Sequence, residues 1–358
     1  MTRILPLSVA ATGLLAACTS TGRAPSATTQ ATFAVQHSIR VPVPDGARRV
    51  RVWFPVPGDD EHQTVTDLDV QASTACRTVQ DANGNRYVYA ETTGADGDVR
   101  IRTSFRVTRR EVLGDIDPAH TRPLTEAERR QHAASLASNQ HVVVDDGIRT
   151  LAAQIAGDEQ NPVLVARRLY DWTLDNVEYW VKDPSRWKAS PVGSSEYCLS
   201  SRTGNCTDFH SLWTALARAR GIPTRMKYGS LFKPSLDGVD QDASYHCWPE
   251  SWFPGIGWVP NDVAVADIYR GSYALDASNR DKVVLTTAAG YRGPDERMVD
   301  YYFGNLDCRR VCWTEGRDLT LDPPQAGGPV NAVAKGYVEI DDAPFAAFER
   351  KMTYREIQ

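Results

Sequence analysis

The 358-residue sequence lacks basic runs, internal repeats and, beyond its N-terminal end, long apolar runs. With a formal net charge of −5 and no basic run, we expect no nucleic-acid partner. The missing repeats exclude a solenoid or a propeller. Because no later stretch is apolar enough to cross a bilayer, we expect no membrane span after the first 17 residues. The composition, 42% hydrophobic and 24% charged, is that of a globular chain long enough for two domains.

The N-terminal end has the pattern of a secretion signal. Arg3 precedes an apolar run from Ile4 to Ala17, which is too short for a settled membrane span. The run ends in Leu15-Ala16-Ala17-Cys18, which resembles the lipobox of bacterial lipoproteins. In that family the signal is cleaved before the cysteine, and the cysteine is lipidated. The alternative is an ordinary secretory signal that contains a cysteine.

The lipobox resemblance predicts where the protein is found. Residues 1–17 are then the signal peptide, and Cys18 carries the lipid that holds the chain on a membrane. Thr19 stands where an acidic residue would imply inner-membrane retention, so we expect the periplasmic face of the outer membrane in a bacterial cell envelope. Residues 18–32, rich in Ser, Thr, Ala and Pro, are expected to form a flexible tether.

Seven cysteines fit an oxidising compartment imperfectly. If one of them is a free nucleophile, five remain besides Cys18, so at least one other thiol is unpaired. Cys308 and Cys312 are close enough in sequence to form a disulfide, but spacing cannot prove it. The pairing stays open for Cys76, Cys198, Cys247, Cys308 and Cys312.

Hydrophobic periodicity divides the rest of the chain. Residues 33–113 alternate apolar and polar side chains, which predicts a small antiparallel β-domain. Residues 114–159 indicate a connector with a helix, and residues 160–270 a helix-then-sheet core of the α+β class. Residues 271–358 contain further strand-like segments, which we expect to form a β-rich C-terminal extension.

The core is organised around an amphipathic helix that begins at Cys206. Apolar residues recur at helical spacing after it, and Gly221 and Pro223 mark the end. Thr207 or Asp208 is expected to cap the start. The positive end of the helix dipole and the free backbone N–H groups favour a thiolate there, which is the nucleophilic form. A small buried cysteine is the ordinary alternative.

A predicted hairpin supplies two partners for this thiol. His246 lies on one strand and Asp262 on the next, with the turn at residues 254–257 midway between them. Cross-strand neighbours of this kind can form an Nδ1–H to carboxylate hydrogen bond, which leaves the other nitrogen for Cys206. Alternation puts Cys247 on the opposite face of its strand, which makes it a poor nucleophile.

These residues together resemble the transglutaminase-like superfamily of papain-type cysteine enzymes, whose chain order is Cys, His, Asp. The resemblance is specific over about residues 160–270 and rests on Gly204 to Phe209, Ala217 to Arg225, His246 to Glu250 and Gly257 to Asp262. It implies a Cys-bearing helix packed on an antiparallel sheet, with Cys206 as nucleophile, His246 as general base and Asp262 as the group that orients it. Cys247 departs from the family pattern, where a small residue usually follows the histidine.

Acyl transfer also needs an oxyanion hole, and the backbone N–H of Cys206 is its natural first donor. The side chain of Tyr179, Trp180 or Trp187 is a candidate for the second, although each is more often a core or rim aromatic. His210, one helical turn from Cys206, is interpreted as a packing or supporting residue.

The family resemblance implies acyl transfer on an amide bond through a thioester, without metal or cofactor. Hydrolysis by a peptidase or amidase is expected, with a protein, peptide or cell-wall peptide as substrate. Transamidation, in which an amine replaces water, is the alternative within this chemistry. Two others are a catalytically idle binding scaffold and a structural zinc protein, whose ligands would come from Cys198, Cys206, His210, His246 and Cys247.

Overall fold

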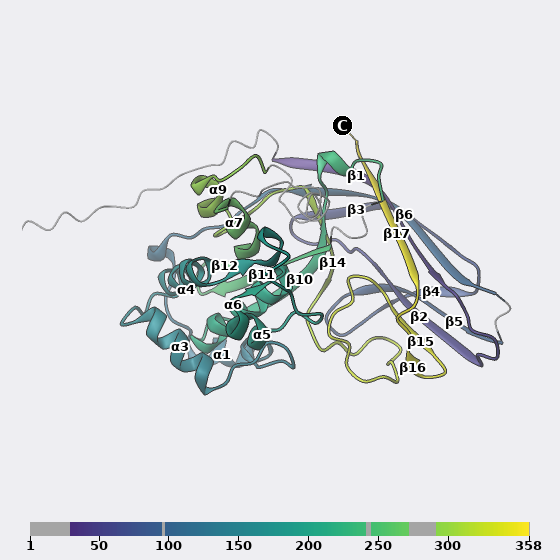
Figure 1. Cartoon of the computed structure of the whole chain (residues 1–358), viewed down its shortest axis with the longest axis horizontal. Helices are drawn as coiled ribbons and strands as arrows, with labels where there is room; N and C mark the ends of the chain where they lie inside the picture. Colours follow the sequence, from purple (N-terminus) through teal and green to yellow (C-terminus); the bar gives the residue numbers. More distant parts are fainter. Residues whose placement is uncertain (1–28, 95–96, 241–244, 272–290, 358) are drawn as a thin grey trace, which may run out of the picture.

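The computed structural model describes residues 29–94, 97–240, 245–271 and 291–357. The predicted signal peptide, Cys18 and most of the predicted tether therefore lie outside the described residues. Within them, Figure 1 shows the helices gathered on one side of the molecule and long strands on the other. None of the described helices is long and apolar enough to span a membrane.

Two antiparallel sheets build the β-module, the name used here for the strand-rich side. One sheet has the order β17-β1-β6-β3 and the other β16-β15-β2-β5-β4. Their inward valines, isoleucines and aromatics alternate with outward polar residues, so the two sheets share an apolar interior. The strands are β1 (Gln30–Val41), β2 (Arg49–Val56), β3 (Gln63–Ala72), β4 (Cys76–Gln80), β5 (Arg86–Thr93), β6 (Val99–Arg110), β15 (Tyr337–Ile340), β16 (Ala343–Pro344) and β17 (Glu349–Ile357).

The C-terminal residues contain strands, as the sequence predicted, and these strands pair with earlier parts of the chain. Strand β17 pairs with β1 along nearly its whole length, from Thr32 opposite Ile357 to Arg40 opposite Glu349. Strand β15 pairs with β2, and β14 (Arg310–Glu315) joins the sheet of the core. The described residues from 291 to 357 thus contribute strands both to the core and to the β-module. Strand pairing between distant segments has no local signal in the sequence, so these partners were not predicted.

The core is a four-stranded antiparallel sheet with helices against it. Its order is β12-β11-β10-β14, and the hairpin β11–β12 turns at residues 254–256 as predicted. The other strands are β10 (Thr224–Leu231), β11 (Tyr245–Phe253) and β12 (Gly257–Pro260), and the helices that surround them are α3 (Asp146–Ala156), α4 (Pro162–Asn176), α5 (Ser195–Ser201), α6 (Cys206–Ala219) and α7 (Val263–Tyr269).

Short elements complete the chain. The connector holds η1 (Pro118–His120), α1 (Glu126–Gln131) and α2 (Ala133–Leu136), and α9 (Glu296–Tyr301) lies against α7. Two-residue strands pair as β7 (Val112–Leu113) with β13 (Asn305–Leu306) and β8 (Glu178–Tyr179) with β9 (Thr203–Gly204), and the remaining single turns are η2 (Trp180–Lys182) and η3 (Pro234–Leu236).

Helix α6 lies at the centre of this arrangement (Figure 1), packed between the core sheet and helices α3, α4, α5 and α7. Its residues from Cys206 to Arg218 are all buried, not only the one apolar face that the periodicity predicted. The cap is Asn205, whose side chain accepts from the backbone N–H groups of Thr207 and Asp208. The predicted cap at Thr207 or Asp208 is therefore wrong. Asp208 instead completes a capping box by accepting from the Asn205 backbone N–H.

Candidate active site

Cys206 is the first residue of α6, and its side chain is only 4% exposed. A hydrogen bond from the Cys247 thiol lowers the pKa of Cys206, burial opposes this, and the hydrogen bond and charge of His246 lower it further. The pKa of this thiol is thereby held well below its ordinary value. The start of a helix adds backbone N–H groups and a positive dipole end, which stabilise the same anion. Cys206 thus has the environment of a thiolate.

His246 and Asp262 meet behind this thiol. Nε2 of His246 lies 2.7 Å from Oδ2 of Asp262, and both side chains are buried. The sequence predicted this pair but assigned the bond to Nδ1. Because Nε2 faces the carboxylate, Nδ1 is the nitrogen left for Cys206. Burial alone would lower the pKa of His246, but the charge and hydrogen bond of Asp262, with a contribution from Cys206, raise it to about 9.

The two residues are not the cross-strand partners that the hairpin argument assumed. Strand β12 ends at Pro260, which pairs with Glu250, so Asp262 lies beyond the ladder. Asp262 caps α7, where its Oδ1 accepts from the Val265 backbone N–H at 3.1 Å. A helix cap fixes its own side chain, and this orientation brings Oδ2 to His246.

The Asp262 carboxylate has two further partners. Nη1 of Arg310, from β14, lies 3.0 Å from Oδ2, and Nε2 of His210 lies 3.3 Å from Oδ1. Burial would raise the pKa of Asp262, but the charge of His246, the His210 hydrogen bond and the charge of Arg310 hold it well below its ordinary range. His210 is therefore a supporting residue, as interpreted from the sequence. The sequence did not predict Arg310 as a partner, because no local pattern links an arginine 48 positions after Asp262 to that carboxylate.

Cys247, the residue after His246 on β11, is buried against α6. Its sulfur lies 3.3 Å from Nδ1 of His210 and 3.6 Å from Oγ1 of Thr207, besides its hydrogen bond to Cys206. Burial and the neighbouring Cys206 raise the pKa of the Cys247 thiol well above its ordinary value. Cys247 is accordingly a protonated donor beside the candidate nucleophile. The six cysteines that the structure describes are all free, so it contains neither a Cys308–Cys312 bridge nor a bridge to Cys247.

The loop before α5 closes on the start of α6. Asp208 accepts from the Ser190 hydroxyl and from the backbone N–H groups of Ser190 and Ser194. Gly193 has a φ of +69°, and a Cβ there would lie 2.2 Å from Thr207. Only glycine fits this close approach. The loop before α5 is thus fixed against the helix that carries Cys206.

The three candidates for the second oxyanion donor lie on the segment that leads into this loop. Tyr179 is buried, with its ring 5.7 Å from that of Phe209. Trp180 begins η2 and is partly buried, and Trp187 packs beneath the guanidinium of Arg186 at 5.6 Å. These positions do not select one of them, and the second donor stays a prediction.

Tyr245, which the sequence argument did not single out, lies next to the site. Its hydroxyl is 3.0 Å from Oγ1 of Thr207, which in turn is 3.9 Å from the sulfur of Cys206. Position 245 precedes His246 on β11, so adjacency to the histidine was the available signal.

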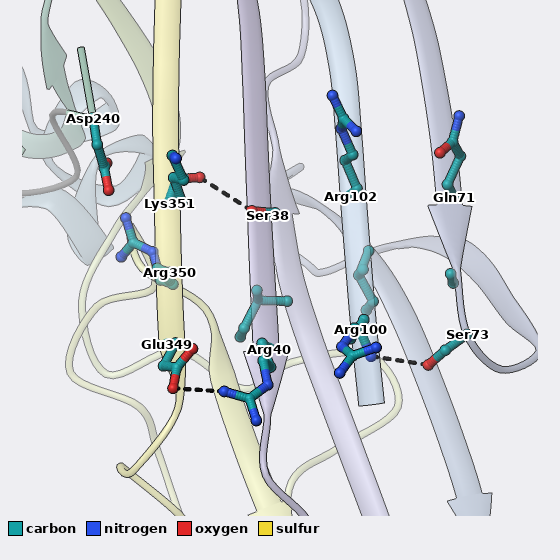
Figure 2. A pocket seen from close by; sticks show the side chains of 13 residues that line it. Ser38, Arg40, Gln71, Ser73, Arg100, Arg102, Asp240, Glu349, Arg350 and Lys351 are labelled. Carbon is teal, nitrogen blue, oxygen red and sulfur yellow. Dashed lines mark hydrogen bonds and ion pairs between the residues drawn. The ribbon is translucent and has the colours of Figure 1, made fainter. Parts of the chain in front are cut away.

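Two other features of the described residues bear on ligand binding. Among the described residues, no group of three or more His, Cys, Asp or Glu side chains is arranged to hold a metal ion, and the zinc alternative gains no support. A hollow of about 580 Å³ lies on the outer face of the β-module, across β17, β1, β6 and β3 (Figure 2). Its lining includes Arg40, Arg102 and Lys351, but none of the catalytic candidates.

Known proteins share this architecture. A model of the transglutaminase-like superfamily matches residues 149–263, which run from α3 to the start of α7. An uncharacterized protein of Haemophilus influenzae is 26% identical over 335 residues, with 86% of each chain covered. A crystal structure from Cytophaga hutchinsonii, named a "putative cysteine protease", superposes with a TM-score of 0.59 at 17% identity, covering 92% of each chain.

The fold is that of papain-like α+β proteins, in which a helix with a cysteine at its start packs on an antiparallel sheet. More particularly, the domain at residues 149–263 belongs to the transglutaminase-like superfamily. The family prediction and the fold class made from the sequence are confirmed.

Proposed function

We propose that this protein is a cysteine hydrolase that cleaves amide bonds through a thioester acyl-enzyme, with Cys206 as nucleophile, His246 as acid and base, and Asp262 as its orienting carboxylate. One observation carries the proposal. Asp262 binds Nε2 of His246, which leaves Nδ1 toward a thiol whose pKa is already lowered. A nucleophile, a base and an orienting group in one buried cluster are the elements that covalent acyl transfer requires.

The proposed first step is acylation. The Cys206 thiolate attacks the amide carbonyl carbon, and a sulfur–carbon bond forms as the carbonyl electrons move to oxygen. The backbone N–H of Cys206 is placed to stabilise this oxyanion. When the tetrahedral species collapses, the carbon–nitrogen bond breaks and His246 Nδ1 gives its proton to the leaving amine. The carboxylate of Asp262 keeps the imidazolium oriented for this transfer.

In the proposed second step, His246 is neutral and accepts a proton from water as the water oxygen attacks the thioester. Collapse expels the Cys206 thiolate and releases a carboxylic acid. An amine in place of water would give a new amide, which is the transglutaminase outcome. Both outcomes use the same three side chains.

The activity is tested with pools of peptides and cell-wall peptide fragments, incubated in ¹⁸O-labelled water with and without a fluorescent primary amine. We expect a new carboxyl group that carries ¹⁸O, and no product in Cys206→Ala. Cys198→Ala is the matched control, because Cys198 is also a buried free thiol but lies outside the triad. Amine-coupled product would indicate transamidation. Turnover that survives in Cys206→Ala would overturn the proposal, and no turnover with any pool would favour a binding scaffold.

We also propose that the protein works in the bacterial cell envelope, held at the outer membrane by a lipid on Cys18. The lipobox-like quartet supports this, and so does the absence of an acidic residue after Cys18. In cells fed a labelled fatty acid, the native protein should carry the label and Cys18→Ala should not. Label retained in the variant would reject the anchor.

A further inference from the structure

A segment that follows the core sheet reaches back to the candidate active site. After β14, the buried side chain of Arg317 donates to Ser211 of α6, to the carbonyl of Val192 and to the side chain of Asn331. The first two contacts lie on the active-site helix and the loop before α5. Arg317 therefore fixes the segment around residues 317–335 against the same elements that surround Cys206.

At the end of this segment, Lys335 places its ammonium group above Tyr245. Nζ lies 5.7 Å from the centre of the Tyr245 ring. The Tyr245 hydroxyl is 3.0 Å from Oγ1 of Thr207, and that oxygen is 3.9 Å from the Cys206 sulfur. These contacts form a continuous path from an exposed cation to the buried nucleophile.

The ammonium group of Lys335 contacts an aromatic ring but no carboxylate of the described residues. Among the described residues, no carboxylate forms an ion pair with Lys335, whose side chain is exposed. Burial of its stem lowers the pKa of Lys335, and the charge of Cys206 acts in the opposite direction. The Cys206 thiolate and the His246 imidazolium balance each other. A cation beside them therefore gives the site an attraction for anions that a substrate can use.

We propose that Lys335 is a specificity-determining residue that selects substrates carrying a carboxylate close to the scissile amide. The inference rests on the proposed function, since it names the substrate class for the same thiol. An acidic peptide would place its carboxylate by the ammonium group while its amide carbonyl meets Cys206. Neutral peptides would lack this contact.

Two small alkylating reagents test this charge selection without a known substrate. Iodoacetate is anionic and iodoacetamide is neutral, and with each the Cys206 sulfur forms a bond to the methylene carbon while iodide leaves. We measure both rates on the full chain, and the ratio of the two reports the local charge. Lys335→Met should lower the iodoacetate-to-iodoacetamide ratio about three- to tenfold, as expected for one charge several ångströms away in a partly aqueous site.

Matched variants separate charge from other effects. Lys335→Arg should keep the ratio near that of the native protein, and Lys335→Glu should lower it below the value for Lys335→Met. Lys351→Met is the control, because Lys351 is an exposed lysine on β17 that lines the hollow in Figure 2, away from Cys206. In the peptide screen, replacing Glu by Gln near the cleaved bond should slow cleavage by the native protein. The same change in the peptide should slow cleavage by the Lys335→Met variant less.

The two proposals fail in different ways. If both reagents label Cys206 and the ratio is the same in Lys335→Met as in the native protein, the specificity inference is overturned and the proposed triad stands. If neither reagent labels Cys206, the proposed function fails as well. A ratio that falls equally in Lys351→Met would also overturn the inference, because it would reflect only the net charge of the molecule.

Discussion

Arg310 Nη1 lies 3.0 Å from Oδ2 of Asp262, the same oxygen that faces His246. The guanidinium is completely buried and also binds Asp307. Two carboxylates thus share one internal cation, and one of them, Asp262, is completely buried. This arrangement makes Arg310 a structural partner of the His246–Asp262 pair.

Replacement of Arg310 by Met should lower the free energy of unfolding by about 3–5 kcal/mol, because it removes a buried cation that pairs with both Asp262 and Asp307. Urea denaturation monitored by tryptophan fluorescence measures the loss. The control is Arg309→Met, since Arg309 is the preceding residue but makes a more exposed ion pair with Glu356. Equal decreases in the free energy of unfolding in the two variants would show that the buried ion pairs of Arg310 stabilise the protein no more than an exposed one.

The pH dependence of turnover should have an upper limb near pH 9. His246 must carry a proton to give to the leaving amine, and Asp262 raises the pKa of His246 to about 9. Asp262→Asn removes the negative charge but keeps an oxygen to cap α7, so the imidazolium loses its proton at lower pH. The upper limb should move down by about one unit or more, toward the ordinary histidine value. Asp175→Asn, in an exposed ion pair with Arg270, should leave it in place. An unmoved limb in Asp262→Asn would contradict the role of the carboxylate.

Cys247 should keep Cys206 ionised by donating its thiol proton in a hydrogen bond. Cys247→Ala removes this donor, so the pKa of Cys206 should rise and alkylation by iodoacetamide should require higher pH. Cys247→Ser retains a donor and should behave more like the native protein. The rate of labelling is followed from pH 4 to about pH 10, a range that spans the values known for cysteines. If the pH profile of alkylation in Cys247→Ala matches that of the native protein, Cys247 does not stabilise the Cys206 thiolate.

The cap at Asn205 should matter for stability as well as for chemistry. Asn205→Ala deletes the acceptor for two backbone N–H groups, and caps of this kind contribute about 1–2 kcal/mol. Asn205→Asp keeps the acceptor and should lose much less. Asn176→Ala, at the exposed end of α4, is the control, and thermal unfolding compares the three variants. If Asn205→Ala unfolds at the same temperature as Asn176→Ala, the capping box does not stabilise the start of α6.

Much of the site is visible in the sequence because its parts are local. The cysteine at the start of a patterned helix and the histidine on a predicted hairpin both follow from short-range rules, as does the turn between its strands. The sequence did not correctly predict which nitrogen of His246 faces Asp262. The Asp262 side chain is oriented by its role as a helix cap and not by strand register.

Longer-range contacts account for what was missed. Arg310 and Lys335 come from segments far along the chain, and no spacing rule links either to Cys206. The placement of β14 in the core sheet and of β17 beside β1 depends on pairing between strands that are distant in sequence. Such pairing is decided by tertiary packing, which a single sequence does not display.

The pairing of β1 with β17 bears on how the protein is made. The edge strand β17 is synthesised after the transglutaminase-like domain, which lies between it and its partner β1 in the chain. The β-module consequently closes only after residues 349–357 have been synthesised. Closure of this sheet therefore depends on a strand made after the transglutaminase-like domain, so a chain interrupted within that domain would leave β1 with an open hydrogen-bonding edge.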